Sequence, residues 1–483
     1  MIGRFTLMSL ETTPKTVFLR DRQAHWEKIS GENAPTLGKY YHRTLTRIYQ
    51  FIIPRGSRVL ELGCGKGQLL AALAPAVGVG IDFSPSAVRV AQESHPQLHF
   101  IEMNAEELNL PAETFDFIIL SDLVNDLWDI QSTLEKLQSY CHPRTRIILN
   151  FHSHLWQGPL RLARRLGLAT PLLRQNWVTV GDIRQLFTLS GFETLKHWSE
   201  MIVPLAIPGA NLINRYLPKI SPFRWLALTN FVIGLPVNLE TNRTPTCSVI
   251  VAARNEEGHI EELFQRTPEL GPGGTELIFV EGNSKDDTYG EIERAIARHP
   301  ERNSRLLKQP GKGKGDAVRT GFAAASGDIL MILDADMTVP PEDLHVFYRA
   351  IASGKGEFIN GVRLVYPMED KAMRFFNLLG NKFFAFAFTW LLGQQMRDTL
   401  CGTKVIWRRD YERLVANRSY FGDFDPFGDF DLLFGAAKLN LKITELPIRY
   451  HTRQYGETNI SRWSHGLLLL RMVLFAARRI KFF

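Results

Sequence analysis

The chain has 483 residues, of which 45% are hydrophobic and 22% are charged, and its formal net charge at pH 7 is +7. This composition excludes a disordered or fibrous protein, and the length predicts about three domains, because one core rarely exceeds about 300 residues. The positive charge fits an anionic partner, which is phosphate, membrane lipid or nucleic acid. From the motifs of the chain we expect no nucleic-acid partner.

The chain start shows no apolar run followed by a small-residue cleavage site, so we expect no signal peptide. The four cysteines lie far apart and form neither a zinc signature nor a disulfide framework. This usage predicts a reducing cytoplasm. We treat residues 1–38 as an N-terminal extension.

Residues 58–73 predict a strand, a glycine turn and a helix. The strand contains Glu61, and three glycines follow it at alternate positions: Gly63, Gly65 and Gly67. Glycines let the backbone approach a ligand closely and adopt positive φ. The next predicted strand ends at Asp82, about 20 residues after Glu61, the spacing at which an acidic residue holds a ribose. On spacing alone, NAD and S-adenosylmethionine both fit.

The exact residues are more specific. Residues 61–67 resemble the first motif of class I S-adenosylmethionine-dependent methyltransferases, in which an acidic residue precedes the first glycine. Residues 80–84, 104–108 and 115–122 are similar to the ribose motif, the adenine-side motif and the fourth strand of that family. The resemblance implies a cofactor site built from Glu61, Gly63, Gly65, Gly67, Asp82, Asn104, Ala105 and Ser121.

The resemblance assigns no catalytic base to this half. Asn125 and Asp126 replace the Glu-His pair that often follows the fourth strand in the family. Asp122, His152 and His154 lie near the expected strand ends, where a structural role is the simpler interpretation. A sulfonium methyl group is already activated, so alignment of the acceptor does most of the work. The alternatives are a non-catalytic cofactor-binding scaffold and an NAD-dependent oxidoreductase.

The middle of the chain is less informative. Residues 155–168 predict a basic amphipathic helix, which caps a site, touches anionic lipid or is simply solvated on its basic face. Residues 201–236 are apolar but interrupted by prolines, which argues against a continuous membrane span. We expect the methyltransferase domain at 39–200 and a proline-interrupted segment with a linker at 201–245.

The strongest local signal is an apolar run, 329–333, that leads into Asp334 and Asp336. Ligands bind at the carboxyl ends of buried parallel strands. Two carboxylates suit Mg²⁺ or Mn²⁺, which completes its shell with substrate phosphate oxygens. The preceding segment, 311–316, is glycine-rich and basic, and suits a diphosphate. The pattern predicts metal-assisted chemistry on a nucleotide diphosphate; a strand followed by an acidic turn is the alternative.

Segments 247–257 and 276–288, together with these motifs, resemble family 2 glycosyltransferases of the GT-A fold, with Glu281 where Asp is usual. Segments 397–404, 427–433 and 445–459 are similar to motifs of dolichol- and polyprenyl-phosphate sugar transferases. The resemblance covers 246–465. It implies a metal site at Asp334 and Asp336. It also implies a donor site formed by Ala253, Asn255, Glu256, Glu281, Lys314, Asp334 and Arg453.

The same resemblance points to three catalytic candidates: Asp398, Asp429 and Asp431. A phosphate acceptor is already anionic and needs no general base, whereas a hydroxyl acceptor needs one, for which Asp429 or Asp431 would be the first candidates. For these two, a carboxylate at a helix start is the structural alternative.

Two apolar segments with basic residues, 375–393 and 467–483, are too interrupted to span a membrane but suit the bilayer interface. Core helices are the alternative. We expect 466–483 to form a basic apolar C-terminal helix.

The sequence therefore predicts an α/β protein with two Rossmann-like domains in tandem. We expect a bifunctional enzyme at the cytoplasmic membrane face. It would transfer methyl groups from S-adenosylmethionine, and sugar from a nucleotide sugar to polyprenyl phosphate with Mg²⁺ or Mn²⁺. The alternative is a glycosyltransferase that acts on a sugar or protein hydroxyl, with a non-catalytic N-terminal domain.

Overall fold

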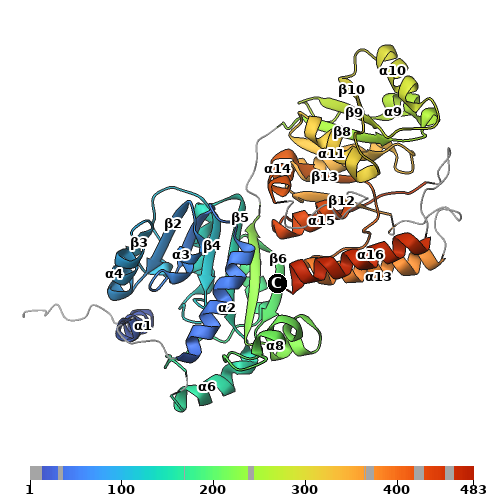
Figure 1. Cartoon of the computed structure of the whole chain (residues 1–483). Helices are drawn as coiled ribbons and strands as arrows, with labels where there is room; N and C mark the ends of the chain where they lie inside the picture. The colour runs from blue at the N-terminus through green and yellow to red at the C-terminus, as the bar shows by residue number, and fades with distance from the viewer. Residues whose placement is uncertain are drawn as a thin grey trace, which may run out of the picture. The chain divides into compact units, whose positions relative to one another are not determined.

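The computed structural model describes residues 13–30, 36–167, 169–237, 244–363, 365, 375–417, 429–451 and 462–482. The chain divides into two compact units, Met1–Leu239 and Glu240–Phe483. Within the described residues, each unit has one seven-stranded mixed sheet with helices packed against it (Figure 1). The predicted tandem α/β architecture is confirmed.

The first sheet has the strand order β3-β2-β1-β4-β5-β7-β6. Its strands are β1 (Arg58–Leu62), β2 (Val77–Asp82), β3 (His99–Glu102), β4 (Phe115–Ser121), β5 (Cys141–His152), β6 (Phe192–Glu200) and β7 (Thr229–Pro236). Strands β1 to β5 pair in parallel, and β7 runs antiparallel to both β5 and β6. The strand order reverses between β1 and β4, so a ligand crevice is expected beyond their carboxyl ends.

The helices of the first unit are α1 (Pro14–Ser30), α2 (Thr36–Ile52), α3 (Gln68–Leu73), α4 (Pro85–Ser94), α5 (Ile130–Leu137), α6 (Gln157–Arg165), α7 (Val180–Leu189) and α8 (Ala210–Tyr216). Local sequence explains several helix starts. Ser84 caps α4, whose first residue is a proline, and Thr179 forms a capping box with Asp182 at the start of α7.

The first unit extends beyond residue 200, where we expected its domain to end. Strand β7 lies between β5 and β6 and buries Phe231, Val232, Ile233 and Leu235. Residues 201–236 therefore belong to this unit and are not a linker segment outside it. The apolar residues at 229–236 are explained by burial on both faces of an internal strand, whereas Leu212, Trp225 and Leu226 before them are exposed.

The second sheet has the order β10-β9-β8-β11-β13-β12-β14. Its strands are β8 (Cys247–Ala253), β9 (Thr275–Glu281), β10 (Ser304–Lys308), β11 (Ile329–Asp334), β12 (Phe358–Val362), β13 (Lys404–Trp407) and β14 (Ile443–Pro447). Strands β8 to β11 pair in parallel, whereas β13 is antiparallel to β11 and β12. The order reverses between β8 and β11, so Asp334 ends a strand at the switch point.

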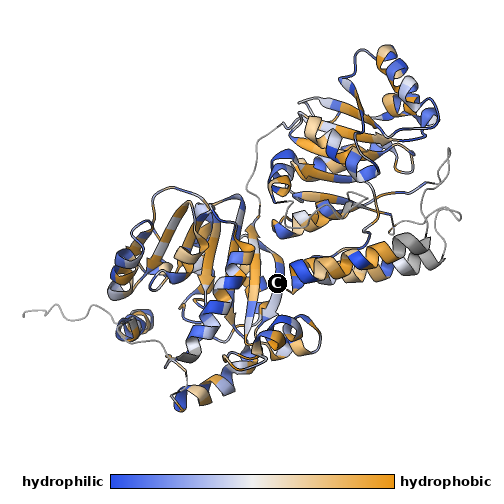
Figure 2. Ribbon diagram, viewed as in Figure 1, coloured by the Kyte–Doolittle hydropathy of each residue, from blue (hydrophilic) through white to orange (hydrophobic). Residues whose placement is uncertain are grey.

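The helices of the second unit are α9 (Ile260–Arg266), α10 (Thr288–Arg298), α11 (Lys314–Ala324), α12 (Leu344–Ala352), α13 (Phe375–Leu392), α14 (Arg408–Ala416), α15 (Asp429–Lys438) and α16 (Arg462–Ala476). Two buried apolar clusters cover the two faces of the sheet, and Figure 2 shows the hydrophobic residues concentrated in its strands. Within the described ranges, no helix combines the length and apolarity that crossing a membrane requires.

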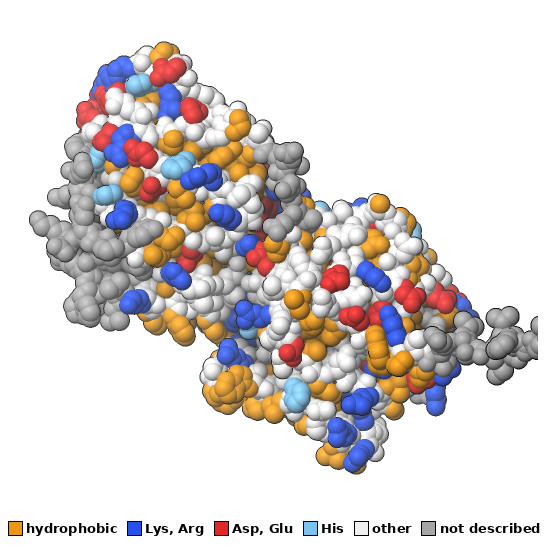
Figure 3. All heavy atoms as spheres, turned by 180° about the vertical axis from the view of Figure 1, so that it is seen from behind, with side chains coloured by type: hydrophobic (Ala, Val, Ile, Leu, Met, Phe, Trp, Pro, Cys, Tyr) orange, Lys and Arg blue, Asp and Glu red, His pale blue; other side chains and the backbone are white. Residues whose placement is uncertain are grey.

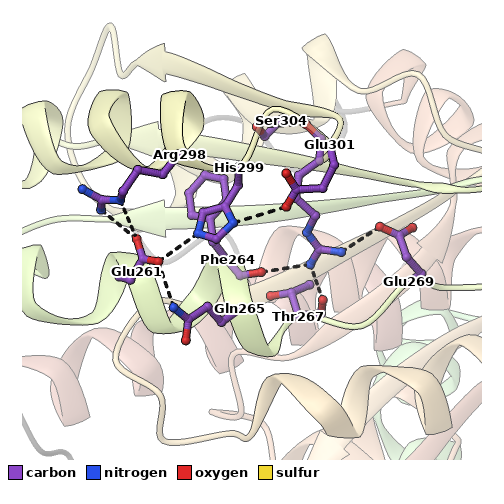
Figure 4. Close-up of polar contacts among 10 residues, drawn as sticks. Glu261, Phe264, Gln265, Thr267, Glu269, Arg298, His299, Glu301 and Ser304 are labelled. Carbon is purple, nitrogen blue, oxygen red and sulfur yellow. Dashed lines mark hydrogen bonds and ion pairs between the residues drawn. The ribbon is translucent and has the colours of Figure 1, made fainter.

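A charged network at the surface joins α9 to the end of α10 (Figure 4). The His299 ring lies 2.8 Å from Glu261 and 3.3 Å from Glu301, and Arg298 pairs with Glu261 at 2.7 Å. The same ring stacks on Phe264, which in turn stacks on a strand residue, Phe279. The network thus connects surface charges to the apolar layer beside β9.

Candidate active sites of the two units

The glycine turn after β1 leaves room beside its backbone. Gly63, Gly65 and Gly67 all have φ between 50° and 72°, a region that side chains rarely adopt. A Cβ on Gly67 would lie 2.5 Å from the Phe100 ring, whereas a Cβ on Gly65 would meet no atom within 4 Å. The turn therefore needs glycine for its conformation and is open at Gly65, where a ligand can approach.

Asp82 ties this turn to the end of β2. One of its oxygens accepts a hydrogen bond from the Gly65 amide at 2.8 Å, and the other accepts from the Ser84 amide at 2.9 Å. Burial raises the pKa of Asp82, and these hydrogen bonds partly oppose the increase. The carboxylate thus fixes the loop geometry at the strand ends.

Glu61 is a buried carboxyl group with an unsatisfied oxygen. Its side chain is 2% exposed, and Oε2 has no hydrogen-bond partner in the described part of the chain. Burial, with a smaller contribution from the nearby Asp82, raises the pKa of Glu61 to about 8. A ligand that donates a hydrogen bond to this oxygen, or that brings positive charge, is expected to stabilise the buried carboxylate.

The remaining predicted cofactor residues also lie at this edge of the sheet. The side-chain oxygen of Asn104 accepts from the Glu106 amide at 3.0 Å and caps the short helix that starts at the buried Ala105. The Ser121 hydroxyl donates to Asn150 at 3.0 Å. The structure therefore brings all the predicted cofactor residues to the carboxyl ends of β1 to β4.

Helix α1 covers this edge, a contact that none of the sequence motifs predicts. Gln23 donates to the Phe83 carbonyl at 2.9 Å, and Glu27 accepts from the Ser84 hydroxyl at 2.5 Å. Trp26 donates to Asp126 at 3.2 Å. Helix α1 therefore bridges the loops after β2 and β4, a pairing between distant segments that no local sequence pattern indicates.

A second feature that we did not assign is a polar network around Asp122. This residue has φ of 55° and accepts hydrogen bonds from Tyr41 at 2.8 Å and Asn150 at 2.6 Å. Burial raises the pKa of Asp122 to about 6. Positive φ in a non-glycine residue is sparsely populated and concentrates at functional sites. In the sequence, the position of Asp122 directly after the strand that became β4 was the signal that could have indicated this network.

In the second unit, three strand ends form the predicted donor site. Ala253 pairs with Glu281 across β8 and β9, and Ala252 pairs with Asp334 across β8 and β11. Glu281 and Asp334 therefore lie on either side of the end of β8, about 10 Å apart at the strand spacing of a sheet. Glu281 accepts from the Ser284 amide at 2.5 Å.

Asp334 lies beneath two chain segments. Lys314, the first residue of α11, contacts its carboxylate at 2.5 Å. Burial favours the neutral acid, but Lys314 and other cations outweigh it and lower the pKa of Asp334. A Cβ on Gly402 would overlap both the Asp334 carboxylate and the Lys314 ammonium. The turn before β13 can therefore pass over this site only with glycine there.

The loops beyond β8 and β11 are held by their own polar side chains. Asn255, with φ of 57°, accepts from the Lys285 amide at 2.7 Å. Glu256 contacts His259 at 3.0 Å, and Asp336 accepts from the Thr338 hydroxyl at 2.7 Å. Asn255 and Glu256 thus hold the loop after β8. Asp336 lies in the turn after β11, separated from Asp334 by one residue.

The three catalytic candidates differ in their placement. Asp398 is fully buried and bound to Arg363 through both oxygens, at 2.7 and 2.8 Å, which suits a positioning role better than proton transfer. Asp431 is 8% exposed on α15. Asp429 begins that helix, but its side chain lies outside the described residues, as does all of Arg453.

Comparison with known proteins identifies both units. Residues 36–197 match the family described as "Methyltransferase domain", and residues 248–415 match "Glycosyl transferase family 2". Three relatives are named as dolichol- or dolichyl-phosphate sugar transferases. A dolichol-phosphate mannosyltransferase of Pyrococcus furiosus is 35% identical over 108 residues, which cover 22% of this chain and 30% of that protein.

The other two relatives are matched over most of their length. A dolichyl-phosphate beta-glucosyltransferase of Dictyostelium discoideum is 27% identical, covering 52% of this chain and 84% of that protein. A dolichyl-phosphate hexose transferase of Haloferax volcanii is 26% identical, covering 47% and 92%. The chain is thus an enzyme in which a methyltransferase domain precedes a glycosyltransferase family 2 domain related to dolichyl-phosphate sugar transferases.

Proposed function

We propose that the first unit binds S-adenosylmethionine and transfers its methyl group. The observation that carries this proposal is the pairing of Glu61, which has an unsatisfied buried oxygen, with an open glycine turn at Gly65. A cationic cofactor with amine and hydroxyl donors fits both features. S-adenosylmethionine supplies a methyl group that is already activated for transfer.

The protein's own groups would then bind and align. Glu61 would accept hydrogen bonds from the cofactor, and Asp82 would keep the glycine turn and the loop at Ser84 in register. Asp122, with a pKa of about 6, is largely ionised at pH 7 and would accept a proton from an acceptor hydroxyl or amine.

Calorimetric titration of the full chain with S-adenosylmethionine tests the first proposal. We expect binding in the wild type, and loss of binding in Gly65→Val, whose side chain would fill the open space. Gly56→Val, at an exposed glycine that likewise has positive φ and no neighbour within 4 Å, is the matched control for backbone strain. Binding that survives Gly65→Val would contradict the placement of the cofactor.

For the second unit we propose transfer of a sugar from a nucleotide sugar to polyprenyl phosphate. Asp334 and Asp336 fit a divalent cation that takes one or two carboxylates and completes its shell with diphosphate oxygens and water. Among the described residues, no cluster of three or more His, Cys, Asp or Glu side chains suited to a metal occurs. Mg²⁺ or Mn²⁺ would stabilise the negative charge of the leaving diphosphate.

The residues around Asp334 have defined parts in this proposal. Lys314 pairs with Asp334, and it is placed to move onto a donor phosphate when the carboxylate takes up a cation. Arg363, held by Asp398, keeps the 398–403 turn over the site. A phosphate acceptor needs no general base, so Asp398 can serve wholly in positioning.

The choice of acceptor is supported by the relatives, which are named for dolichyl phosphate. The surface of α13 and α16 agrees with it. Phe383 and Phe386 are 55% and 75% exposed, and α16 exposes Leu467, Leu470 and Leu474. Exposed basic side chains accompany them: Lys382, Arg471, Arg478 and Arg479. Figure 3 shows hydrophobic side chains at this margin of the second unit. An apolar surface with cations suits anionic lipid head groups.

The test is a transfer assay with full-length protein, Mn²⁺ or Mg²⁺, polyprenyl phosphate and a panel of labelled nucleotide sugars. We expect label in the organic phase, loss of that label in Asp336→Ala, and no loss in Glu301→Ala, an exposed carboxylate far along the sheet. Donor hydrolysis without lipid labelling would contradict the lipid-phosphate acceptor and favour a hydroxyl acceptor.

A further inference from the structure

Two arginines from different helices converge on one carboxylate in the first unit. Arg22 of α1 lies 3.7 Å from Asp126. Arg164 of α6 is near enough for the same carboxylate to raise its pKa against the lowering effect of burial. Asp126 also accepts from Trp26 of α1 at 3.2 Å. The two helices thus meet over the loop that follows β4.

Both guanidinium groups are incompletely satisfied. The Nη2 atom of Arg22 donates to the Arg174 carbonyl at 2.5 Å, and that of Arg164 donates to Gln175 at 3.0 Å. The Nε atoms of both arginines are buried and have no hydrogen-bond partner among the described residues. Arg22 as a whole is only 5% exposed. Buried cationic donors without acceptors are rare in folded proteins and indicate a missing ligand or water.

Arg22 and Arg164 share one carboxylate, Asp126. The neighbouring acid, Glu106, is already paired with Lys15 at 3.4 Å, and the Trp128 amide also donates to it. The Arg22 pKa is lowered by burial and raised by the two acids, Asp126 and Glu106. The pair therefore carries one positive charge more than the carboxylate that it shares, and the next acid, Asp122, interacts with Asp126 but is not among the acids that raise the pKa of either arginine.

The position of this arginine pair relates it to the cofactor crevice. Asp126 follows β4, and its neighbour Asn125 accepts from the His152 amide at the end of β5, at 3.3 Å. The glycine turn and Asp82 lie at the ends of β1 and β2, on the other side of the point where the strand order reverses. A substrate bound at the arginine pair would therefore share the crevice with the cofactor from the side of β4 and β5.

We propose that the methyl acceptor of the first unit carries a phosphate group that is bound by Arg22 and Arg164. A guanidinium group binds oxyanions through two parallel hydrogen bonds. A phosphate monoester presents three oxygens and more negative charge than a carboxylate, so it can accept hydrogen bonds from two arginines that approach from different helices. This inference rests on the methyltransferase function proposed above and names the class of its acceptor.

Calorimetry with inorganic pyrophosphate tests the inference on full-length protein saturated with S-adenosylhomocysteine. EDTA is present throughout, so that metal-dependent diphosphate binding by the second unit does not contribute. We expect Arg22→Met and Arg164→Met each to weaken pyrophosphate binding at least tenfold. Arg165→Met, the adjacent and exposed arginine of α6, is the matched control and should change it less than twofold.

Asp126→Asn separates ligand binding from a structural role. Removing the one carboxylate that competes for both arginines should tighten pyrophosphate binding severalfold, whereas loss of a purely structural tie would weaken it or leave it unchanged. This readout also serves if the arginine variants fold poorly.

The outcomes distinguish the two proposals. If S-adenosylhomocysteine does not bind to the wild type, the methyltransferase proposal fails. If it binds but pyrophosphate binds equally to the wild type and the Arg22→Met/Arg164→Met double variant, or binds to neither, the phosphate-bearing acceptor alone is overturned.

Discussion

Replacing Glu61 with glutamine should stabilise the ligand-free first unit while it impairs cofactor binding. The Glu61 pKa rises from 4.5 to about 8 on folding because the carboxyl group is buried. Because the folded state holds this proton more tightly than the unfolded state, the carboxyl group contributes its full stabilisation below pH 4.5. This contribution is lost as the pH rises from 4.5 towards 8. Between pH 4.5 and pH 7 the free energy of unfolding therefore falls by about 3 kcal/mol, at about 1.36 kcal/mol per pH unit.

Glutamine keeps the shape of Glu61 and has no charge to bury. Glu61→Gln should therefore unfold at about the same temperature as the wild type at pH 4.5, and roughly 6–12 °C higher at pH 7, for a unit of this size. The assay is thermal unfolding at both pH values, with the transition of the first unit identified in the wild type by its shift on adding S-adenosylhomocysteine. Glu93→Gln, an exposed acid on α4, is the control. An equal difference at both pH values, or a less stable variant at pH 7, would refute the reasoning.

Three further predictions concern the second unit. Gly402→Ala should reduce sugar transfer by about 100-fold, because its methyl group would displace Asp334 and Lys314; Gly380→Ala, whose Cβ meets no atom within 4 Å, should leave transfer unchanged. Asp398→Asn should lower the free energy of unfolding by about 3–5 kcal/mol in denaturant titrations, because it leaves Arg363 buried without its counter-charge; a loss below 1 kcal/mol would contradict this. The His299 pKa is raised by Glu261, so its stabilising contribution is complete below pH 6.5 and is lost as the pH rises through the raised value. Wild type and His299→Gln should therefore differ in unfolding temperature more at pH 5.5 than at pH 8. An equal difference at both pH values would contradict a stabilising ion pair between His299 and Glu261.

The sequence was informative wherever structure and chemistry are local. Strand ends at Asp82 and Asp334 follow from apolar runs that stop at a carboxylate, and the glycine turn follows from residue type alone. These features place the predicted cofactor and donor residues at sheet edges in both units. Their roles in binding and catalysis stay predictions.

Other features depend on contacts between distant segments. The extent of the first unit was missed because β7 is inserted between β5 and β6 from a later part of the chain. The role of α1 depends on contacts with loops after β2 and β4. The partner of Asp398 is Arg363, 35 residues earlier and outside the motif that suggested a catalytic role. No local pattern specifies these pairings.

The most direct test of two independent transferase sites is a paired measurement on one set of full-length variants. Binding of S-adenosylmethionine and transfer of labelled sugar to polyprenyl phosphate are measured for wild type, Gly65→Val and Asp336→Ala. We expect Gly65→Val to lose cofactor binding and keep sugar transfer, and Asp336→Ala to show the opposite pattern. Loss of both activities in either folded variant, or of neither in both, would contradict the assignment of one site to each unit.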